Sequence, residues 1–441
     1  LMLPATALQH LLLRAFAGPL VMTSGNLSGE PPCSRNDDAL RFLGGLADAV
    51  LLHDLDIVAR QDDSLYSSDA AGPSALRIGR GLAPWQGRSP LTAKVPVLAL
   101  GGQLKASFCM LRGQQWTLSQ HCGDLHRVLT LADYEQALQH FHALLQFRPE
   151  RIAVDCHPEY QTHQIGRALA EAQGLPLIEV QHHHAHAVAC LAEHQLDAAL
   201  GPWLAVCFDG LGYGEDGALW GGEFLRVDHA QYRRLGRLQP TPLPGGVAAM
   251  REPWRNLYAQ IQQHWRWPDF HAEFGWLRPW SDWADYPLAS LDAMLDSGLN
   301  SPACSSVGRL FDAVACALGL APRQLAYEGQ AAMQLEAAVD QAALSQTESA
   351  YPLGLAMQGG LMTLSSGALW PPLLRDRQRG VAVGVIAARF HRGLAVATAS
   401  VCQQLREAEN LGADVLLSGG VLQNSVFSTC CLEELRKRGL R

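Results

Sequence analysis

The sequence lacks the spacings and runs that define several common protein classes. It has eleven cysteines but no pair with CxxC spacing, which argues against a disulfide scaffold or a zinc ribbon and favours reduced thiols. We expect Cys190, Cys207 and Cys316, which lie in apolar stretches, to pack in the core. A membrane span needs about 18 consecutive apolar residues, and no apolar run in the chain is that long. We therefore expect a cytoplasmic protein without a membrane segment.

An excess of positive charge is also missing. The chain has 34 Lys and Arg against 42 Asp and Glu, giving a formal net charge of -8. This balance argues against a nucleic-acid-binding protein that relies on bulk positive charge. The chain has no P-loop, no GxGxxG element, no nucleophile elbow and no short repeat, so these motifs cannot explain a function.

What is present is a long chain with alternating patterns. Its 441 residues exceed one ordinary core, so we expect two or three domains. It begins with LMLPATALQ, without a basic leader, and ends with EELRKRGLR at an expected helix end. We expect both ends to be fragment ends, and we do not interpret the start as a signal peptide.

The order of apolar runs predicts the fold class. The Pro-, Gly- and Arg-rich stretch 72–96 predicts a linker. Short runs around Gly101-Gly102 then predict a meander of strands, and a helix at 131–147 follows. Strands and helices alternate after that. The strands are expected at 151–157, 176–182 and 203–210, and the helices at 161–173 and 184–194. This order indicates an α/β protein with a mixed sheet.

The C-terminal half predicts a second α/β layer after a helical insertion. Residues 247–340 have a mostly helical pattern and contain Trp254, Trp265, Trp267, Trp276, Trp280 and Trp283. A core role for these rings is favoured over a lid or a partner surface. Strands are then expected at 351–357, 360–366 and 414–418, with a long helix at 381–409. Two α/β halves around an insertion suggest two lobes and a cleft, with ligands at the carboxyl ends of strands.

A histidine cluster, QHHHAH, is the strongest candidate for a metal site. If a helix begins near His182, then His182 and His186 are four residues apart on one face and could chelate a divalent ion. The alternative is a set of hydrogen-bonded or surface histidines. Asp209 ends the next apolar strand and could supply an oxygen ligand. It could instead cap the turn before Gly210.

Glycine turns after strands are candidates for anion or nucleotide binding. In FDGLGYGEDGALWGGEF the glycines could adopt positive φ and bring amide groups to a phosphate, or they could form a plain hairpin. Gly419-Gly420 and, more weakly, Gly101-Gly102 with Lys105 follow the same pattern. Three such turns point to a nucleotide in the cleft.

Three stretches with acidic residues keep two interpretations each. Asp312 and Glu336 lie in helical patterns and could accept a ribose hydroxyl or form salt bridges. In DCHPEY, Asp155, His157 and Glu159 could form a metal or base cluster, but a polar turn after a strand is favoured.

Taken together, these motifs resemble the HypF-type carbamoyltransferases of nickel–iron hydrogenase maturation. The stretches that carry the resemblance occur in family order and cover nearly the whole chain. They are MTSGNLSGEPP, DDS, ALGGQLKASF, DCHPEY, QHHHAH, FDGLGYGEDGALWGGEF, REPWR, SSVGRLFDAVACALG, YEGQAAMQLE and LSGGVLQN. The family joins an acylphosphatase domain, a zinc-finger region, a YrdC-like domain and a TsaD-like domain. The chain looks like the end of the YrdC-like domain (1–90) and most of the TsaD-like domain (91–441), with the insertion at about 247–340.

The resemblance implies a fold and a ligand set. It implies an actin-like, ribonuclease-H-like two-lobed fold from about residue 95, and an iron or zinc ion held by His182, His186 and Asp209. A further aspartate ligand is expected in a DGG-type motif, and no such motif follows Leu440, so we expect a truncated C-terminus. The nucleotide, with magnesium as a further candidate ion, would lie near Gly212, Asp312, Gly329, Glu336, Gly419, Gly420 and Asn424.

The resemblance also implies a reaction. Thr23, Ser24 and Asn26 resemble an adenylate-binding TSxN element. The stretch after DDS lacks the family's usual basic residues, so we do not expect this chain to make carbamoyl-adenylate alone. The family makes carbamoyl-adenylate from carbamoyl phosphate and ATP and transfers the carbamoyl group to the C-terminal cysteine of the partner HypE, without nucleic acid or membrane.

Other functions fit some of the same motifs. A carbamoyltransferase acting on a small-molecule hydroxyl could use the same pair of domains. A non-catalytic, actin-like scaffold would bind nucleotide without metal dependence. The tRNA threonylcarbamoyl enzyme is less favoured, because it lacks the fused YrdC-like segment and this chain is acidic.

Overall fold

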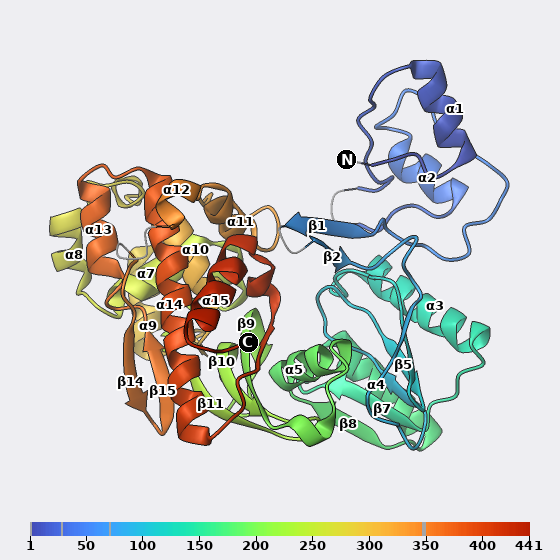
Figure 1. Ribbon diagram of the computed structural model, residues 1–441. Helices are drawn as coiled ribbons and strands as arrows, with labels where there is room; N and C mark the ends of the chain where they lie inside the picture. The colour runs from blue at the N-terminus through green and yellow to red at the C-terminus, as the bar shows by residue number, and fades with distance from the viewer. Residues whose placement is uncertain (1, 28–29, 70–71, 346–349) are drawn as a thin grey trace.

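The computed structural model describes residues 2–27, 30–69, 72–345 and 350–441. These residues form an N-terminal segment and two larger lobes, each built on its own sheet (Figure 1). Both large sheets contain parallel and antiparallel strand pairs. The expected class, α/β with mixed sheets, is therefore confirmed.

The N-terminal segment, blue in Figure 1, contains two helices and an antiparallel strand pair. Neither helix buries a residue, and α1 exposes four apolar side chains at the spacing of one helix face. These side chains are Leu8, Leu11, Leu12 and Phe16. The elements are α1 (Ala7–Phe16), α2 (Asn36–Leu43), β1 (Leu65–Asp69) and β2 (Gly72–Arg77).

The first lobe is a six-stranded sheet in the order β3-β6-β5-β4-β7-β8. Its core joins Leu98 and Ile152 of the sheet to Tyr134 and Phe141 of helix α3. Strands β4, β7 and β8 run parallel. The elements are β3 (Trp85–Arg88), β4 (Val97–Ala99), β5 (Cys109–Arg112), β6 (Gln115–Leu118), α3 (Val128–Leu144), β7 (Arg151–Asp155), α4 (Gln161–Gln173) and β8 (Leu177–Val180).

The predicted linker at 72–96 is wrong, because this stretch contains two strands. β2 pairs with β1, and β3 forms the edge of the first-lobe sheet by pairing antiparallel with β6. The partner of β3 lies well downstream in the sequence. Local composition showed only the turn-forming Pro and Gly residues, not this hydrogen bonding.

The second lobe contains the eight-stranded sheet. Its path is β12-β13-β10-β11-β15-β14, and β9 pairs with both β10 and β16. The strands are β9 (Trp203–Tyr213), β10 (Leu219–Val227), β11 (Tyr232–Leu238), β12 (Thr241–Pro242), β13 (Ala303–Cys304), β14 (Gly354–Gln358), β15 (Leu361–Ser365) and β16 (Val415–Ser418).

Helices cover this sheet, as the yellow to red ribbons of Figure 1 show. The long helix expected at 381–409 is confirmed as α14. The helices are α5 (His182–Glu193), η1 (Ala198–Leu200), α6 (Val247–Arg251), α7 (Pro253–Gln262), α8 (Trp267–Phe274), η2 (Trp280–Asp282), α9 (Leu288–Ser297), α10 (Val307–Ala317), α11 (Gln330–Ala337), α12 (Gln341–Leu344), α13 (Trp370–Gln378), α14 (Val383–Glu409), η4 (Gly420–Gln423) and α15 (Ser425–Lys437).

Strand β9 is apolar on both faces because both faces are covered. Leu204, Val206 and Phe208 belong to the large core of the second lobe. The alternate residues Ala205 and Cys207 pack in a separate cluster with α5. Because side chains alternate along a strand, the residue two positions after Cys207 also faces α5. That residue is Asp209.

The core predictions for cysteine and tryptophan are mostly confirmed. Cys207 and Cys316 are buried, whereas Cys190 is only partly buried against the α5 cluster. Five of the six tryptophans belong to the second-lobe core or pack against it. Trp276 is the exception, with 63% of its surface exposed.

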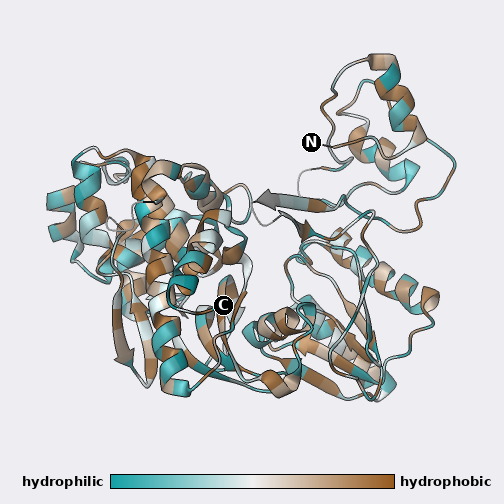
Figure 2. Ribbon diagram, viewed as in Figure 1, coloured by the Kyte–Doolittle hydropathy of each residue, from teal (hydrophilic) through white to brown (hydrophobic). Residues whose placement is uncertain are grey.

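The strands of both large sheets are largely apolar, whereas the helices alternate between apolar and polar residues (Figure 2). This distribution is typical of sheets that helices cover. Among the described residues, we find no helix with the length and apolar character needed to cross a bilayer.

Candidate metal centre

Helix α5 places two of the clustered histidines on one face. It begins at His182, two residues earlier than expected, because the Gln181 side chain accepts a hydrogen bond from the His184 amide at 2.9 Å and caps the helix. His182 and His186 are one turn apart. Ala187 and Leu191 pack the helix against the second-lobe sheet. Burying a leucine in this way contributes about 1.5–3 kcal/mol.

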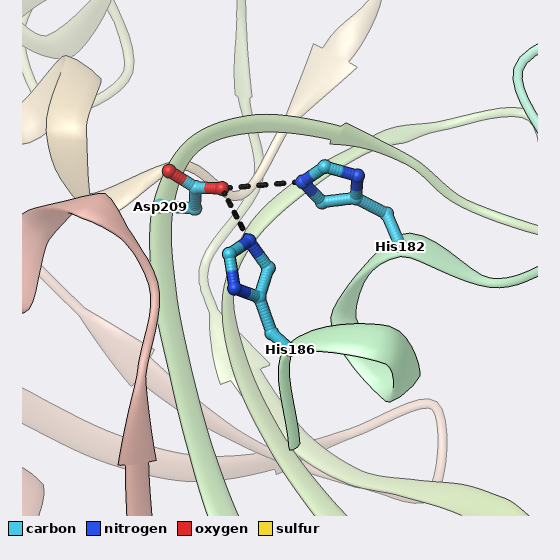
Figure 3. Close-up of side chains that lie close together, drawn as sticks. All are labelled: His182, His186 and Asp209. Carbon is cyan, nitrogen blue, oxygen red and sulfur yellow. Dashed lines mark hydrogen bonds and ion pairs between the residues drawn. The ribbon is translucent and has the colours of Figure 1, made fainter. Parts of the chain in front are cut away.

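Asp209 meets both histidines from the end of the apolar part of β9. Its Oδ2 atom lies 3.3 Å from Nε2 of His182 and 3.3 Å from Nε2 of His186 (Figure 3). Its Oδ1 atom accepts the Gly210 amide at 2.7 Å and the Gly420 amide at 3.2 Å. The expected ligand role and the turn-capping alternative therefore use different oxygens of one carboxylate.

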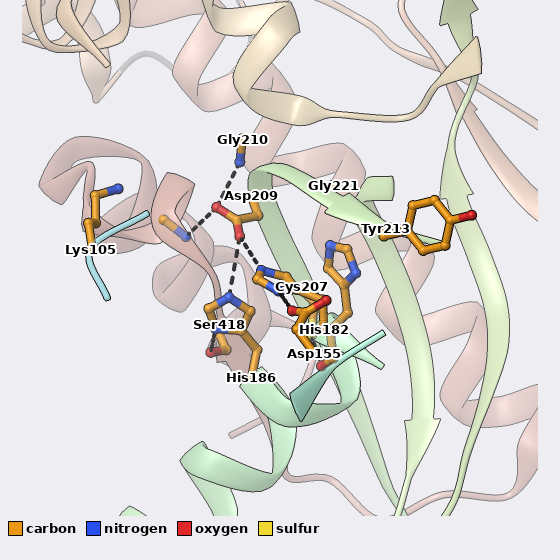
Figure 4. A network of polar contacts seen from close by, with 12 residues as sticks. Lys105, Asp155, His182, His186, Cys207, Asp209, Gly210, Tyr213, Gly221 and Ser418 are labelled. Atoms are coloured by element: carbon orange, nitrogen blue, oxygen red, sulfur yellow. Dashed lines mark hydrogen bonds and ion pairs between the residues drawn. The ribbon is translucent and has the colours of Figure 1, made fainter. Parts of the chain in front are cut away.

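The other ring nitrogen of each histidine also has a partner (Figure 4). Nδ1 of His182 lies 2.7 Å from Oδ2 of Asp155, at the end of β7. Nδ1 of His186 lies 3.4 Å from the hydroxyl of Ser418, at the end of β16. The sequence interpretation missed both contacts. The favoured polar turn in DCHPEY is present, because Oδ1 of Asp155 accepts the His157 amide at 2.9 Å.

Parallel strand pairing explains how these partners reach the helix. Asp155 is paired in register with Val180, so its strand ends beside the strand that leads into α5. Ser418 is paired with Cys207, two residues before Asp209. The carboxyl ends of two parallel strand pairs, one from each lobe, thus meet at the start of α5.

The electrostatics of the cluster favour positive charge between its members. Burial lowers the pKa of His182, but hydrogen bonds to Asp155 and Asp209 outweigh this effect and raise the pKa to about 10. Burial raises the pKa of Asp209, but hydrogen bonds from His182 and His186 lower it well below its usual range. Asp209 is therefore an anion at neutral pH.

The donor atoms fit a divalent cation. The three ligand atoms lie within 4.8 Å of one another. If each neutral imidazole carries its proton on Nδ1 and donates it in a hydrogen bond to its partner, both Nε2 lone pairs face Oδ2 of Asp209. Such an arrangement is repulsive unless a proton or a cation lies between them. Two imidazoles and a carboxylate are ligands that zinc and iron accept.

The remaining histidines of the segment are not among the three residues whose ligand atoms converge. His183 is fully buried, and burial lowers its pKa well below the usual value. His184 contacts the carbonyl of Asp228 through Nε2 at 2.9 Å. His194 is the exposed C-cap residue of α5. These three histidines lie outside the ligand cluster.

Gly212 is needed for packing, and the expectation of positive φ is wrong for it. Of the four glycines that follow Asp209 in the FDGLGYGEDG motif, only Gly217 has a positive φ, at 72°. A Cβ atom on Gly212 would lie 2.4 Å from Cε1 of His183 and 2.8 Å from Cδ2 of His182. This strand glycine therefore allows the histidine helix to approach β9 closely.

The Gly419-Gly420 turn, unlike Gly212, has the positive φ that was expected of the glycine turns. Gly419 has φ of 104°, and a Cβ atom there would lie 2.3 Å from the Phe208 carbonyl oxygen. The same turn directs the Gly420 amide to Asp209. At the weaker candidate, Gly101 has φ of 69°, and Lys105 forms a 3.0 Å ion pair with Glu328 of the second lobe.

The side chains expected at the nucleotide have protein partners. Asn424 caps α15 by accepting the Phe427 amide at 2.8 Å. Glu336 accepts the amide and the hydroxyl of Ser425, both at 2.7 Å. Gly329 has φ of 76° and precedes α11. Both side chains thus stabilise the first turn of α15, where amide groups would otherwise lack acceptors.

Asp312 differs, because its carboxylate is buried without a hydrogen bond. It is 1% exposed, and Arg309 lies 3.0 Å from Oδ2 as an ion pair. Neither carboxylate oxygen has a hydrogen-bond donor among the described residues. Burial outweighs the effect of Arg309 and raises the pKa of Asp312 to about 6.

The TSxN element lies apart from the histidine cluster. Ser24 and Asn26 line a cavity of about 240 Å³ between the N-terminal segment and the first lobe, and Thr23 is not among its lining residues. Asn26 donates to the carbonyl of Glu30 at 2.8 Å. Cationic and imidazole side chains of the same cavity are Arg60, Arg77, His121, Arg127 and His140.

Family comparisons cover almost the entire chain. Residues 205–441 match the family described as "Carbamoyltransferase, Kae1-like Domain, second subdomain". Residues 92–193 match "HypF Kae1-like domain". Residues 1–79 match the Sua5, YciO and YrdC family, described as "Telomere recombination".

Individual proteins give the same result. The chain is 40% identical to "Carbamoyltransferase HypF" of Rhodobacter capsulatus, covering all of this chain and 56% of that protein. It is 34% identical to "Carbamoyltransferase HypF homolog" of Cupriavidus necator, covering 78% of this chain and 86% of that protein. The chain thus spans little more than half of the first of these relatives.

Solved structures agree in fold. A crystal structure of full-length HypF in the phosphate- and nucleotide-bound form has a TM-score of 0.90 and 32% identity, covering all of this chain and 66% of that one. A crystal structure of HypF from T. kodakarensis has a TM-score of 0.84 and 28% identity, covering 95% of this chain and 54% of that one.

Proposed function

The chain belongs to the HypF carbamoyltransferase family, and from this membership we propose that it carries the carbamoyl-transfer site of a hydrogenase maturation enzyme. The donor is carbamoyl-adenylate, which the whole enzyme makes from carbamoyl phosphate and ATP. The acceptor is the C-terminal cysteine of HypE. The cluster of His182, His186 and Asp209 supports this proposal most directly, because its ligand atoms converge within 4.8 Å.

We assign the three clustered residues to an iron or zinc ion. When bound, such an ion supplies Lewis-acid chemistry by withdrawing electron density from a carbonyl or phosphoryl oxygen. The protein holds Nε2 of each histidine and Oδ2 of Asp209 toward one point. The Gly210 and Gly420 amides fix the other oxygen of Asp209. These contacts keep the carboxylate oriented throughout the reaction.

The transfer itself needs no covalent enzyme intermediate. The partner thiolate attacks the carbamoyl carbon and forms the C–S bond. The bond from that carbon to the adenylate phosphate oxygen breaks, and AMP leaves with the electron pair. The product is a thiocarbamate. Amide groups of the glycine turns other than those of Gly210 and Gly420, which donate to Asp209, would stabilise the leaving phosphate.

Asp312 supports a nucleotide between the lobes. Its carboxylate has the ion pair with Arg309 but no hydrogen bond among the described residues. A buried acceptor without a hydrogen bond is costly unless a ligand supplies a donor. We propose that a ribose hydroxyl is that donor. Gly329, Gly419 and Gly420 would then shape the surrounding loops, and Gly212 would let the histidine helix approach β9. Glu336 and Asn424 would cap the adjacent helix, with magnesium as a counterion of the phosphates.

The test is carbamoylation of HypE by the full-length protein with ATP and carbamoyl phosphate. His182→Ala and His186→Ala should each abolish zinc or iron binding and lower transfer at least 100-fold. His194→Ala is the matched control on the same helix, because His194 is exposed and outside the cluster. Unchanged transfer in the two ligand variants would refute the assignment.

The same assay distinguishes the other functions. Transfer to a small-molecule hydroxyl but not to HypE would indicate an O-carbamoyltransferase. Nucleotide binding without metal dependence and without transfer would indicate a scaffold. Cavity-lining Ser24 and Asn26, with Thr23, are proposed to bind adenylate. Substitutions there should impair adenylate formation while leaving transfer from supplied carbamoyl-adenylate intact.

A further inference from the structure

Asp155 contacts the candidate metal centre without belonging to its ligand set. Its side chain is 7% exposed, and its Oδ2 lies 2.7 Å from Nδ1 of His182. Its Oδ1 accepts the His157 amide at 2.9 Å, and Nδ1 of His163 lies 2.9 Å from its backbone oxygen. The His157 amide therefore holds the carboxylate through Oδ1, and His163 holds the backbone of the same residue.

The chemistry of this contact selects one form of the imidazole. A carboxylate accepts hydrogen bonds and donates none, so Nδ1 of His182 must carry a proton. In a neutral ring, Nε2 then has the free lone pair. That nitrogen is the one 3.3 Å from Asp209. The Asp155 contact thus leaves Nε2 of His182 free to bind a cation, and this nitrogen lies where the ligand atoms converge.

The partner of His186 does not select one tautomer of the ring. Ser418 is 3.4 Å from Nδ1 of His186, and a hydroxyl can either donate or accept. It can therefore accompany either neutral form of that ring. The protein therefore fixes which ring nitrogen of His182 is free to bind a cation. It does not fix this for His186.

We propose that Asp155 is a positioning residue that sets the tautomer and orientation of His182 for metal binding. This inference rests on the proposed metal site and adds a residue from the other lobe to it. Asp155 lies at the end of β7 in the first lobe, whereas Asp209 and Ser418 lie on second-lobe strands. Outer partners of this kind typically contribute a factor of about 10–100 to metal affinity.

Asp155→Asn is the decisive variant. The amide keeps the volume and can still accept the His157 amide. Its NH2 group, however, can donate to Nδ1 of His182 and so favour the tautomer with a proton on Nε2. We expect the affinity of the full chain for zinc, measured by competition with a chromophoric chelator, to fall about 10–100-fold. The melting temperature of the metal-free protein should stay close to that of the wild type.

Asp124→Asn is the matched control. Asp124 also contacts a histidine, His126, at 2.8 Å, but this exposed pair is not part of the ligand cluster. Its loss should leave zinc affinity unchanged. Affinities are compared at a temperature at which circular dichroism shows every variant folded, so that unfolding cannot imitate lost positioning.

The results separate the inference from the metal site on which it rests. If the wild type binds zinc and Asp155→Asn binds equally well, the positioning role is refuted while the metal site stands. If the wild type binds no better than His182→Ala, both are refuted. A lower affinity in Asp155→Asn alone, with Asp124→Asn unchanged, supports the inference.

Discussion

Gly212 shows how closely the residues around the candidate metal centre pack. The glycine lies within β9, and its missing side chain leaves room for the rings of His182 and His183. Gly210, two residues earlier, has no atom within 4 Å of the position of a Cβ atom. Neither glycine has a positive φ. The two positions therefore differ in available space and not in backbone strain.

We expect Gly212→Ala to displace the histidines. The added methyl group would overlap the His183 ring, and such overpacking typically costs about 1–3 kcal/mol. Zinc affinity and melting temperature should both fall, as measured by chelator competition and by calorimetry. Gly210→Ala should change neither. Equal behaviour of the two alanine variants would contradict the packing role given to Gly212.

Residue spacing was sufficient to predict the candidate ligand set, whose atoms the structure brings within 4.8 Å of one another, but not its partners. The four-residue spacing of His182 and His186 and the position of Asp209 after an apolar strand are local properties of the sequence. The contacts of Asp155 and Ser418 depend on which strands are neighbours in two different sheets. Spacing along the chain does not contain that information. The packing role of Gly212 was missed in the same way, because it depends on how closely helix α5 approaches β9.

At the scale of elements, helix α15 depends on side chains at its first turn. Asn424 caps the helix and also contacts the buried His391 through Nδ2 at 3.1 Å. Glu336 of α11 accepts hydrogen bonds from the following residue, Ser425. Two elements are thus joined at one helix end.

Replacing Asn424 with alanine should lower the free energy of unfolding by about 0.5–2 kcal/mol, the usual cost of losing an N-cap. Asn424→Asp should retain most of the stability, since aspartate also caps helices and favours their N-termini. Chemical denaturation of both variants measures the difference. A loss in Asn424→Asp as large as that in Asn424→Ala would show that the contact with His391, and not the cap, is the important one.

Elements were predicted well where the pattern is local and poorly where it is not. The helix expected at 161–173 matches α4, and the long helix expected at 381–409 is α14. Strand β3 was hidden in a stretch of turn-forming residues, because only its pairing with β6 makes it a strand. The helical insertion was recognised, although the short strand β13 within it was not.

For the whole molecule, buried histidines make stability depend on pH. His391 is fully buried, and burial lowers its pKa from 6.5 to about 4. Its Nδ1 lies 2.8 Å from the Ala387 carbonyl, and its Nε2 faces the Asn424 amide. Protonation of Nε2 would place a donor against a donor. Because the folded pKa is below the unfolded pKa, stability is lost as pH falls from about 6.5 toward 4.

We expect the wild type to lose roughly 2 kcal/mol of unfolding free energy from His391 alone between pH 7 and pH 5. His121, whose pKa burial also lowers to about 4, acts in the same direction. Asp312, whose pKa burial raises to about 6, acts in the opposite direction. Urea denaturation at several pH values should show a smaller loss in His391→Gln than in the wild type. Parallel curves would contradict this role of His391.

Asp155 lies in the first lobe, whereas Asp209 and Ser418 reach the candidate metal centre from the second lobe. His182 contacts the first lobe through Asp155 and the second lobe through Asp209. Any movement of one lobe relative to the other therefore changes the environment of a proposed metal ligand. Thermodynamic linkage makes such an effect reciprocal: a nucleotide that alters the metal affinity by some factor must have its own affinity altered by the same factor when metal binds. The two proposed ligands of this protein would then act as each other's effectors.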